Sequence, residues 1–541
     1  MMNKKRVLSL LTASLLMASL TASCGNENAG SSAESSTAGS ASSGTSESST
    51  DTAAATDPYE PIDGKEYTIT WTSNVYETLD EHPRMLEYWE EMFDVNIEFI
   101  ALDAQNWDEQ LNILISGGTI PDKIRISNND RYRSFVSQGV LAEIPEEVIQ
   151  THCPNIYGFY EKEAPLALQN ATVDGAIYAL PIYKEDTRLR QGLFWRGDYL
   201  DALGVEAPST IEEMESVLQK IRDEDPDGNG QNDTYGISQT AFTCVYGAYG
   251  APLDIWMQTE DGEDLVYSST LPGVKDALTT LQRWYQEGYI DPEFVTGENK
   301  GGYWAISTVF ATGRVAASQL GNYYHWGPTA AGATVDEMKL ANPDAYVTVG
   351  PLPEGPDGKK GMPVANMYGG GYDGFSVNLE EEPDKLGKIL EIADYFYQDL
   401  ETFYTMRFGI QGEMWDYQEN GAPGMIGEYA EDTTKQAKAG AGTLFQFITP
   451  FEYMDTLSPE NWEWGKENGL DRDFYVNELY ATLPSAAQYM TDLQNMQAEY
   501  FQKIITGEWS VDKFDEFVDN WMAQGGSTLV EEANEWWDSL K

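Results

Sequence analysis

The chain is poor in cysteine, histidine and basic residues. Its 541 residues include three Cys, three His, and 33 Lys and Arg against 89 Asp and Glu, a formal net charge of −56 at pH 7. So acidic a surface repels nucleic acid and anionic lipid headgroups, and it disfavours a strongly anionic ligand unless a local cluster of Arg and Lys overrides the field. His82, His152 and His325 are scattered and form no HExxH motif, no zinc-ligand spacing and no recognisable Ser-His-Asp set. Composition therefore disfavours a DNA, RNA or polybasic membrane role.

Long apolar runs are also missing, apart from one at the N-terminus. Three basic residues at 4–6 precede an apolar stretch over 7–20, which is shorter than the ~20 residues that span a bilayer. A basic start, a short apolar stretch and small residues before Cys24 are typical of an export signal. The junction resembles a bacterial lipobox, in which Cys24 is lipidated and becomes the new N-terminus, with Thr21 where an aliphatic residue is usual. The alternative is ordinary secretion with Cys24 unmodified.

Composition also predicts how the rest of the chain is organised. Residues 25–56 are rich in Ser, Ala, Gly and Thr and poor in aromatics, so they cannot bury enough apolar surface to offset their ordering entropy. We interpret them as a flexible tether. The remaining chain, about 480 residues, exceeds what one core usually accommodates, so at least two domains are expected. Cys153 and Cys244 could pair, but two cysteines in so long a chain do not make a disulfide scaffold.

Hydrophobic periodicity predicts alternating strands and helices after residue 66. Residues 67–72 and 95–102 have the β-branched, aromatic character of strands, whereas 84–93 and 107–115 carry apolar residues at helical spacing. This order favours an α/β domain with largely parallel strands. Further helices are predicted over 210–222, 274–287, 384–398, 486–505 and 511–522. Thr210 and Glu213 form the pattern of a capping box at the start of the first of these.

The loop over 225–236 has oxygen-bearing residues at alternate positions, as calcium loops do. Positions 1, 3, 5, 7 and 9 of an EF-hand-like loop are Asp225, Asp227, Asn229, Gln231 and Asp233. Gly230 at position 6 permits the sharp turn, and hard oxygen donors suit Ca²⁺. Gly236 stands at position 12, where EF-hands use a bidentate Glu. The sequence therefore predicts a structural calcium site, and the alternative is an Asp/Asn/Gly turn without metal.

Several motifs occur together in one order. They are residues 117–122 (GGTIPD), 129–131 (NDR), 139–144 (GVLAEI), 173–181 (VDGAIYALP) and 310–317 (FATGRVAA). The set resembles the extracellular solute-binding proteins of ABC importers, the family that includes maltose-binding protein. Segments 225–236, 355–359 and 408–415 further resemble the large Gram-positive lipoprotein members, which are related to alginate-oligosaccharide binders that carry calcium in such a loop.

The resemblance implies an α/β fold of the type II periplasmic-binding-protein class, with two lobes joined by hinge crossings and a ligand cleft between them. The expected boundaries are a leader over 1–23 and a tether over 24–58. Lobe 1 is expected over 59–181 and about 318–378, and lobe 2 over 182–317 and about 379–541. The implied function is a non-enzymatic, monomeric receptor, lipid-anchored on the extracytoplasmic face, that binds an oligosaccharide and delivers it to membrane permease subunits.

The resemblance also carries ligand-binding roles onto matched positions. Asn129, Asp130 and Arg131 correspond to the family's D-R segment, and Glu185 corresponds to a ligand-contacting Glu after the first crossing. Asn74 and Tyr76 follow the first predicted strand, at the expected cleft edge. The aromatic candidates, which lie in irregular stretches, are Trp256, Tyr323, Tyr324, Trp326, Tyr368, Tyr372 and Trp415. Trp89, Trp107 and Trp536 fall on predicted helices and are expected to be packing residues, as is Trp195.

Two other functions are compatible with the sequence. A secreted carbohydrate-active enzyme would need two carboxylates at a fixed separation, and the 89 acidic residues do not exclude such a pair. Nothing around them resembles a hydrolase motif. A binder of peptides or other small solutes on the same fold is the second alternative, because a fold does not determine its ligand.

Overall fold

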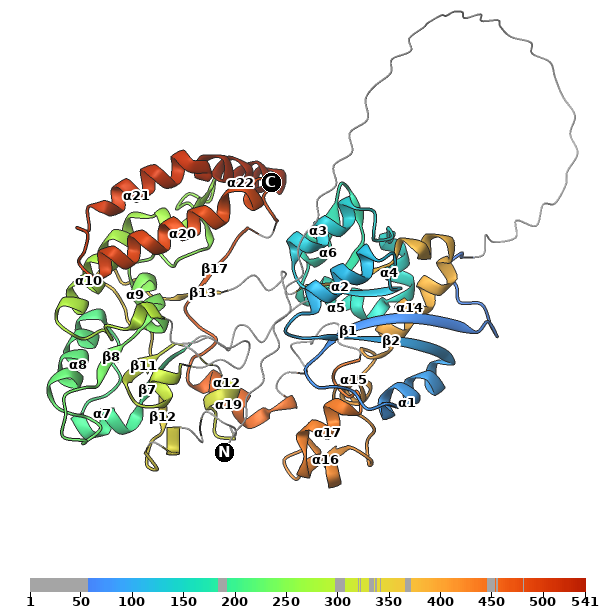
Figure 1. Cartoon of the computed structure of the whole chain (residues 1–541), viewed down its shortest axis with the longest axis horizontal. Helices are drawn as coiled ribbons and strands as arrows, with labels where there is room; N and C mark the ends of the chain where they lie inside the picture. Colours follow the sequence, from blue (N-terminus) through green and yellow to red (C-terminus); the bar gives the residue numbers. More distant parts are fainter. Residues whose placement is uncertain are drawn as a thin grey trace, which may run out of the picture. The chain divides into compact units, whose positions relative to one another are not determined.

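The computed structural model describes residues 57–182, 192–296, 307–319, 321, 323–329, 335, 338–340, 342–364, 371–444, 453, 456–479 and 481–541. Residues 57–541 form one compact unit, which contains two large α/β cores (Figure 1). No helix in the described ranges is long and apolar enough to cross a membrane. The predicted leader, Cys24 and the tether to residue 56 lie outside the described residues.

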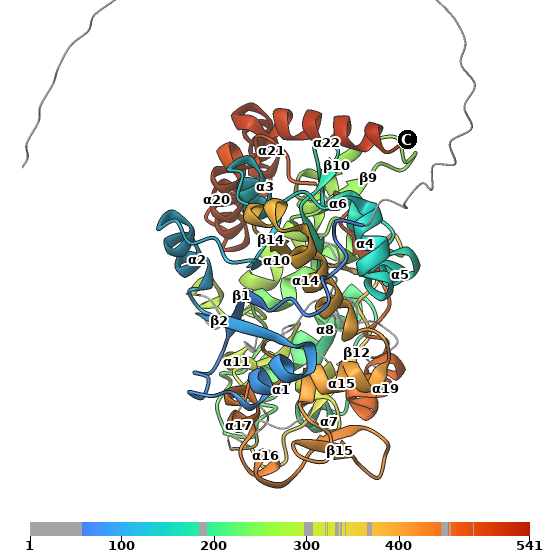
Figure 2. The same ribbon diagram turned by 90° about the vertical axis from the view of Figure 1, so that its right-hand side faces the viewer.

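The first core is built on a five-stranded sheet of order β2-β1-β3-β14-β6. Its strands are β1 (Tyr67–Val75), β2 (Val95–Asp103), β3 (Lys123–Ile126), β6 (Ala179–Pro181) and β14 (Tyr372–Phe375). β1 pairs in parallel with β2 and β3, and the long β1–β2 pair lies side by side in Figure 2. β14 is antiparallel to both β3 and β6. The carboxyl ends of β1, β3 and β6 therefore share one edge of the sheet with the start of β14.

The helices of the first core pack against this sheet or on one another. They are α1 (Arg84–Phe93), α2 (Trp107–Ser116), α3 (Asn129–Ser137), α4 (Glu146–His152), α5 (Pro154–Glu163), α6 (Ala167–Asn170), α14 (Pro383–Tyr395) and α15 (Leu400–Phe408). The predicted packing role of Trp89 is confirmed, because its indole is 1% exposed and meets Phe396 edge to face. α14 starts with a proline in its first turn, where a missing N–H costs nothing, and it contacts α4 and α5.

The second core is built on a four-stranded sheet of order β12-β7-β11-β8. Its strands are β7 (Leu193–Arg196), β8 (Tyr235–Ile237), β11 (Val315–Ser318) and β12 (Val347–Gly350). Because successive strand residues face opposite sides, Leu193 and Trp195 enter the main core while Phe194 enters a smaller cluster with Phe310 and Trp326. Trp195 is thus the core residue predicted.

Helices cover the second sheet and extend the core. They are α7 (Gly197–Leu203), α8 (Ile211–Asp223), α9 (Phe242–Ala248), α10 (Pro272–Gln286), α20 (Ala486–Ile505), α21 (Lys513–Trp521) and α22 (Ser527–Ser539), with the short α11 (Thr308–Ala311), α12 (Tyr323–Trp326) and α19 (Pro459–Glu467). Figure 1 draws α20, α21 and α22 in red; α20 contacts both α10 and α21, and α22 contacts β10. Two-stranded pairs complete the fold: β4 (Thr172–Val173) with β5 (Ala176–Ile177), β9 (Trp256–Gln258) with β10 (Leu265–Tyr267), β13 (Met362–Val364) with β17 (Phe474–Val476), and β15 (Trp415–Tyr417) with β16 (Pro423–Met425).

The cores divide the chain differently from the expected lobe boundaries. Residues 318–364 were expected in lobe 1, but β12 pairs with β7, and Leu352 and Met362 pack in the second core. Residues 379–444 were expected in lobe 2, but α14 and α15 pack in the first core. The described chain passes between the cores after residues 182, 364 and 444. The correction follows from β11, which pairs with β7 and β8 and so stays within the second sheet instead of leading back to the first.

The cap of helix α8 differs in part from the predicted capping box. Thr210 Oγ1 caps α8 by accepting from the Glu213 N–H at 3.1 Å, but the Glu213 carboxylate reaches Ser209, not the N-cap residue. Only half of the predicted capping box is therefore formed.

Cys153 and Cys244 are both unpaired and buried, one in each large core, so they do not bridge in this structure. Burial raises the pKa of both thiols.

Candidate functional site at the sheet edges

Polar side chains collect at the edge of the first sheet where its parallel strands end. Asn129 follows β3 and Tyr372 begins β14, directly across from Ile126. The Tyr372 hydroxyl donates to Asn129 Oδ1 at 3.1 Å, and Asn129 Nδ2 donates to Thr482 Oγ1 at 2.8 Å. Ligands of α/β proteins bind outside the carboxyl ends of the strands. This edge is therefore the first candidate for a binding site.

Tyr372 is held in place by stacking. Its ring lies 4.3 Å from that of Tyr132, at an interplanar angle of 16°, and both rings are fully buried. Burial raises the pKa of both phenols well above the usual value, so both stay neutral and can donate. The predicted aromatic at 372 thus orients Asn129 through its hydroxyl, and its ring face is covered by Tyr132.

Helix α3 presents one polar face to a cavity. Asn128 caps the helix by accepting from the Arg131 N–H at 3.0 Å. Residues four apart share a helix face, so Arg133 lies on the same side as Asn129. Arg133 lines a cavity of about 430 Å³, and its Nε atom is buried with no hydrogen-bond partner among the described residues. A buried donor of this kind is costly unless something accepts from it.

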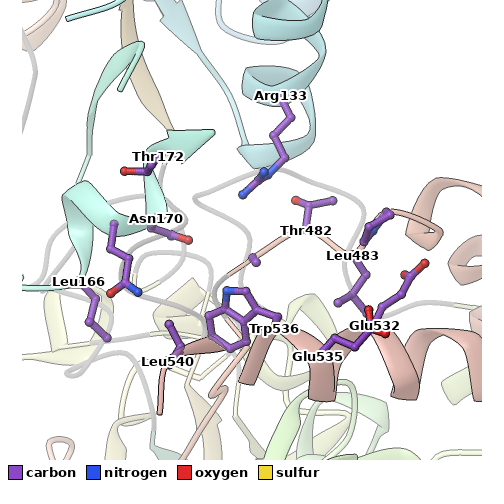
Figure 3. A pocket seen from close by; sticks show the side chains of 13 residues that line it. Arg133, Leu166, Asn170, Thr172, Thr482, Leu483, Glu532, Glu535, Trp536 and Leu540 are labelled. Carbon is purple, nitrogen blue, oxygen red and sulfur yellow. The ribbon is translucent and has the colours of Figure 1, made fainter. Parts of the chain in front are cut away.

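The cavity is walled by segments of both cores. Figure 3 shows Arg133 pointing into it from α3, with Thr482 nearby and Trp536 on the opposite wall. The other lining residues are Leu166, Gln169, Asn170, Thr172, Ala481, Leu483, Pro484, Glu532, Glu535 and Leu540. An indole, a guanidinium, amides, hydroxyls and carboxylates surround one volume. This combination can hydrogen-bond hydroxyl groups and cover an apolar ring face.

Arg131 has a different role from the one that the family resemblance implies. Its guanidinium donates to the Asp108 carbonyl at 2.6 Å and to Asn112 Oδ1, and its Nε atom lies 3.3 Å from Asp108 Oδ1. Arg131 therefore ties α3 to α2, and Asp130 beside it is exposed. The helical spacing explains this result, because residue 131 lies about 200° around the helix from Asn129.

Three predicted aromatic contacts are corrected to packing residues. Trp256 is 4% exposed and packs on Tyr267, with ring centroids 5.4 Å apart. Trp326 is 7% exposed and meets Phe310 edge to face. Trp415 is fully buried in the first core and donates from Nε1 to the Gly409 carbonyl at 2.7 Å. Their place in stretches predicted to be irregular suggested a cleft position for these indoles, but each fills a core.

The remaining predicted positions stay predictions. Glu185 and Tyr368 lie outside the described residues, and of Tyr323 and Tyr324 only the backbone, in α12, is described. Asn74 is half-buried near the end of β1, and Tyr76 just beyond it is 64% exposed, at the same sheet edge as Asn129.

Sequence reasoning missed Arg133, Asn170, Thr482 and Trp536 as lining residues. Trp536 was assigned to packing because it lies on a helix, and it is half-buried against the second core while also lining the cavity. The signal for Arg133 was present in its spacing of four from Asn129. Thr482 and Trp536 come from segments more than 340 residues away, which no local pattern connects to α3.

A second cavity, of about 570 Å³, lies within the second core. Gln239, just after the end of β8, lines it together with Tyr246 and Phe501. Gln497 also lines it, and its Nε2 atom donates to Asp254 at 2.9 Å. Aromatic rings and side-chain amides line this cavity, but they all come from segments of the second core.

The predicted calcium loop brings its carboxylates toward one point. Asn229 Nδ2 donates to Asp227 at 2.8 Å and to Asp233 at 3.0 Å, and the Gly230 N–H donates to Asp225 Oδ2 at 2.8 Å. Asp225 Oδ1 is buried with no hydrogen-bond partner among the described residues. Desolvation, then the neighbouring charges of Asp225 and Asp233, raise the pKa of Asp227. The donor set fits a hard divalent cation, because a cation would relieve this repulsion.

Two α/β cores, three chain crossings and polar side chains at a shared sheet edge define a two-lobed substrate-binding protein. Residues 84–371 match the family described as bacterial extracellular solute-binding proteins, and the chain belongs to this family. Members of this family bind solutes outside the cell.

Three known proteins illustrate the relationship. The chain is 22% identical over 479 residues to the polygalacturonan/rhamnogalacturonan-binding protein YtcQ of Bacillus subtilis, covering 86% of this chain and 90% of that protein. It shares its fold with the Streptococcus pneumoniae ABC-transporter substrate-binding protein FusA, solved as an EF-hand mutant with fructo-nystose, at a TM-score of 0.64 and 16% identity over 87% of this chain and 99% of that one. The alginate-binding protein AlgQ2, solved without calcium ion, superposes with a TM-score of 0.62 at 16% identity over 89% and 99% of the two chains.

Proposed function

We propose that this protein is the lipid-anchored receptor of an ABC importer and that it binds an oligosaccharide between its two lobes. The family is extracellular and solute-binding, and the similar proteins named above are a polygalacturonan/rhamnogalacturonan binder, a protein solved with fructo-nystose and an alginate binder. The receptor would hand the bound sugar to permease subunits in the membrane.

One observation carries the sugar assignment: the Arg133 guanidinium, whose Nε atom is buried, and the Trp536 indole line the same cavity. A pyranose ring offers an apolar C–H face that stacks on an aromatic ring, and its hydroxyls accept from guanidinium groups and donate to carboxylates. Asn129 and Thr482 at the adjoining sheet edge add further hydrogen-bonding groups. Asn74, Tyr76 and Glu185 remain proposed contacts on the grounds of the resemblance.

A thermal-shift screen tests this assignment against the peptide alternative. The full chain is heated with oligogalacturonides, fructo-oligosaccharides, alginate oligosaccharides, peptides and amino acids. A ligand that binds only the folded state at 100 times its Kd adds about 2.7 kcal/mol of stability. At least one oligosaccharide is expected to raise the Tm. If peptides raise it and no sugar does, the oligosaccharide assignment is wrong.

The protein is proposed to bind its sugar without cleaving it. The walls of the cavity include Glu532 and Glu535, but the Glu532 carboxylate is engaged by the Ser485 N–H at 3.0 Å and by its hydroxyl at 2.6 Å. A glycosidase needs one carboxylic acid able to donate a proton and one free carboxylate. Incubation with each sugar is expected to release no new reducing ends, and measurable turnover would favour the enzyme alternative.

We further propose that the loop over 225–233 binds a structural calcium ion. Asp225, Asp227, Asn229 and Asp233 would supply side-chain oxygens, with Asn229 turning its amide oxygen inward and Gln231 contributing at position 7. The ion would cross-link carboxylates that otherwise repel one another. Its role would be to fix the connection between α8 and β8.

Lipidation of Cys24 is proposed to hold the receptor at the outer face of the membrane. The leader ends in small residues before this cysteine, as a lipobox does. Fractionation of cells producing the wild type and Cys24→Ala tests the anchor. The wild type is expected in the membrane fraction, and membrane retention of Cys24→Ala would contradict the proposal.

A further inference from the structure

The first described residues are docked against helices α4 and α14. The backbone of Tyr59 packs on Gly387, in the second turn of α14, so closely that a Cβ atom at position 387 would overlap the Tyr59 carbonyl oxygen. A glycine inside a helix costs roughly 1 kcal/mol relative to alanine. Its presence here allows the N-terminal arm, residues 57–60, to approach the helix closely.

His152 ends α4 beneath this arm. The residue is 3% exposed, and the Tyr59 ring covers it, with ring centroids 6.5 Å apart. Its Nε2 atom lies 3.2 Å from Asp57 Oδ2, and its Nδ1 atom lies 3.4 Å from Glu391 Oε1 on α14. The imidazole is therefore held between two carboxylates from different parts of the chain.

Three side chains able to ligate a transition metal, two carboxylates and one imidazole, meet at this point. Asp57, Glu60 and His152 each present one ligand atom, and the three atoms lie within 4.8 Å of one another. In a tetrahedral zinc site with bonds of about 2.0–2.1 Å, neighbouring ligand atoms lie about 3.3 Å apart. The 3.2 Å separation of His152 Nε2 and Asp57 Oδ2 matches that edge.

Glu391 supplies the partner that a metal-bound histidine requires. A ligating imidazole usually donates its second ring N–H to a carboxylate, which fixes the ring orientation and raises its basicity. Glu391 stands at the Nδ1 atom while Nε2 faces the arm. In addition, the Tyr59 N–H donates to Asp57 Oδ1 at 2.9 Å, which orients this carboxylate and leaves Oδ2 facing His152.

We propose that Asp57, Glu60 and His152 form a zinc site that fastens the N-terminal arm to α4 and α14. The mixed nitrogen and oxygen ligands suit Zn²⁺ and other first-row metals, whereas Ca²⁺ and Mg²⁺ prefer oxygen alone. A water would complete the coordination. The site is separate in sequence from the loop over 225–233, and its residues belong to the first core or pack against it.

Zinc binding to the full chain, stripped of metal with a chelator and then dialysed, tests the proposal. The probe is Zn²⁺ alone, in competition with a chromophoric zinc chelator, with bound metal counted by elemental analysis. We expect one Zn²⁺ per chain and a Tm that rises on zinc addition. Two variants remove ligands: His152→Gln, and the double variant Asp57→Asn with Glu60→Gln. The double variant changes exposed side chains only, so its fold is retained even if His152→Gln is unstable.

Both ligand variants are expected to weaken zinc binding at least tenfold, and Glu391→Gln is expected to weaken it about 10- to 100-fold through the orientation of His152. His82→Gln removes an exposed histidine elsewhere and serves as the matched control, with unchanged affinity expected. Equal zinc affinity in the wild type and the double variant, or a loss in His82→Gln, would overturn the proposal. So would binding of Ca²⁺ as tight as that of Zn²⁺ at this site.

Discussion

At the residue scale, Asn129 joins three parts of the chain through the oxygen and the nitrogen of its side-chain amide. It accepts from the buried Tyr372 hydroxyl and donates to Thr482, so it links β14, α3 and the segment before α20. The family resemblance predicts ligand contacts at positions 129–131, and these contacts stay predictions. In the structure Arg131 turns toward α2, whereas Arg133 lines the cavity on the same face of α3 as Asn129. The spacing of four residues along a helix distinguishes Arg133 from Arg131 as the neighbour of Asn129.

Asn129→Ala is predicted to destabilise the fold by about 1–3 kcal/mol, because it leaves the buried Tyr372 hydroxyl without its acceptor. In a Tyr372→Phe background the same change should cost about 1 kcal/mol less, a coupling that a double-mutant cycle in urea measures. Asp130→Ala, an exposed neighbour, is the control and should change stability by less than about 0.5 kcal/mol. Strict additivity of the two changes would show that the hydrogen bond is not energetically significant.

Lys123 is a charged residue inside the first core. Its Nζ atom lies 2.6 Å from Asp373 Oδ1, and both side chains are 1% exposed. Arg125 approaches the same carboxylate at 3.2 Å. Burial lowers the pKa of Lys123 to about 8, against the opposing effect of Asp373. No sequence pattern predicted this buried lysine, because lysine side chains are usually solvated.

The pKa of Lys123 makes stability pH-dependent in a defined direction. An unfolded lysine titrates near 10.4, so between pH 8 and 10.4 the unfolded chain binds more protons and this group's contribution to stability rises with pH. The free energy of unfolding of the wild type, minus that of Lys123→Met, should therefore increase by roughly 2–3 kcal/mol from pH 7 to pH 10. Urea unfolding at both pH values measures it. A difference that stays constant would mean that Lys123 titrates normally.

At the element scale, hydrophobic periodicity predicted the first two strands and the long helices, but it did not predict which distant segments pair with one another. Periodicity predicted β1, α1, β2 and α20 nearly to the residue, because each has one clearly apolar face. The proposed calcium loop was also visible in the sequence, because its oxygen-bearing residues alternate along nine residues of chain, 225–233. The paired strands β13 and β17 were not, because short strands separated by over 100 residues leave no local signal.

Removal of calcium is predicted to lower stability through the loop between α8 and β8. Addition of a calcium chelator should reduce the Tm of the wild type. Asp225→Asn should abolish that reduction, because it removes the negative charge of the carboxylate whose Oδ1 atom is buried without a hydrogen-bond partner among the described residues. Asp223→Asn is the matched control, because Asp223 pairs with Arg222 just outside the loop. A chelator effect of the same size in Asp225→Asn would exclude this loop as the calcium site.

At the scale of the whole molecule, the sequence predicted the α/β class and the existence of hinge crossings, and it assigned two segments to the wrong core. β11 carries the motif that suggested a crossing, but its neighbours β7 and β8 hold it in the second sheet. Residues 371–444 belong to the first core, because β14, α14 and α15 pack there. Contacts between segments far apart in the chain decided both assignments. Local sequence patterns do not show which distant segments pair.

Isothermal titration of the wild type with the oligosaccharide that raises its Tm most tests the central claim, that a sugar binds in the cavity between Arg133 and Trp536. Trp536→Ala should weaken binding at least tenfold, about 1.4 kcal/mol. Trp537→Phe, which changes the adjacent indole that does not line the cavity, should bind as the wild type does. Equal affinity in the wild type and Trp536→Ala would contradict the account and place the sugar elsewhere.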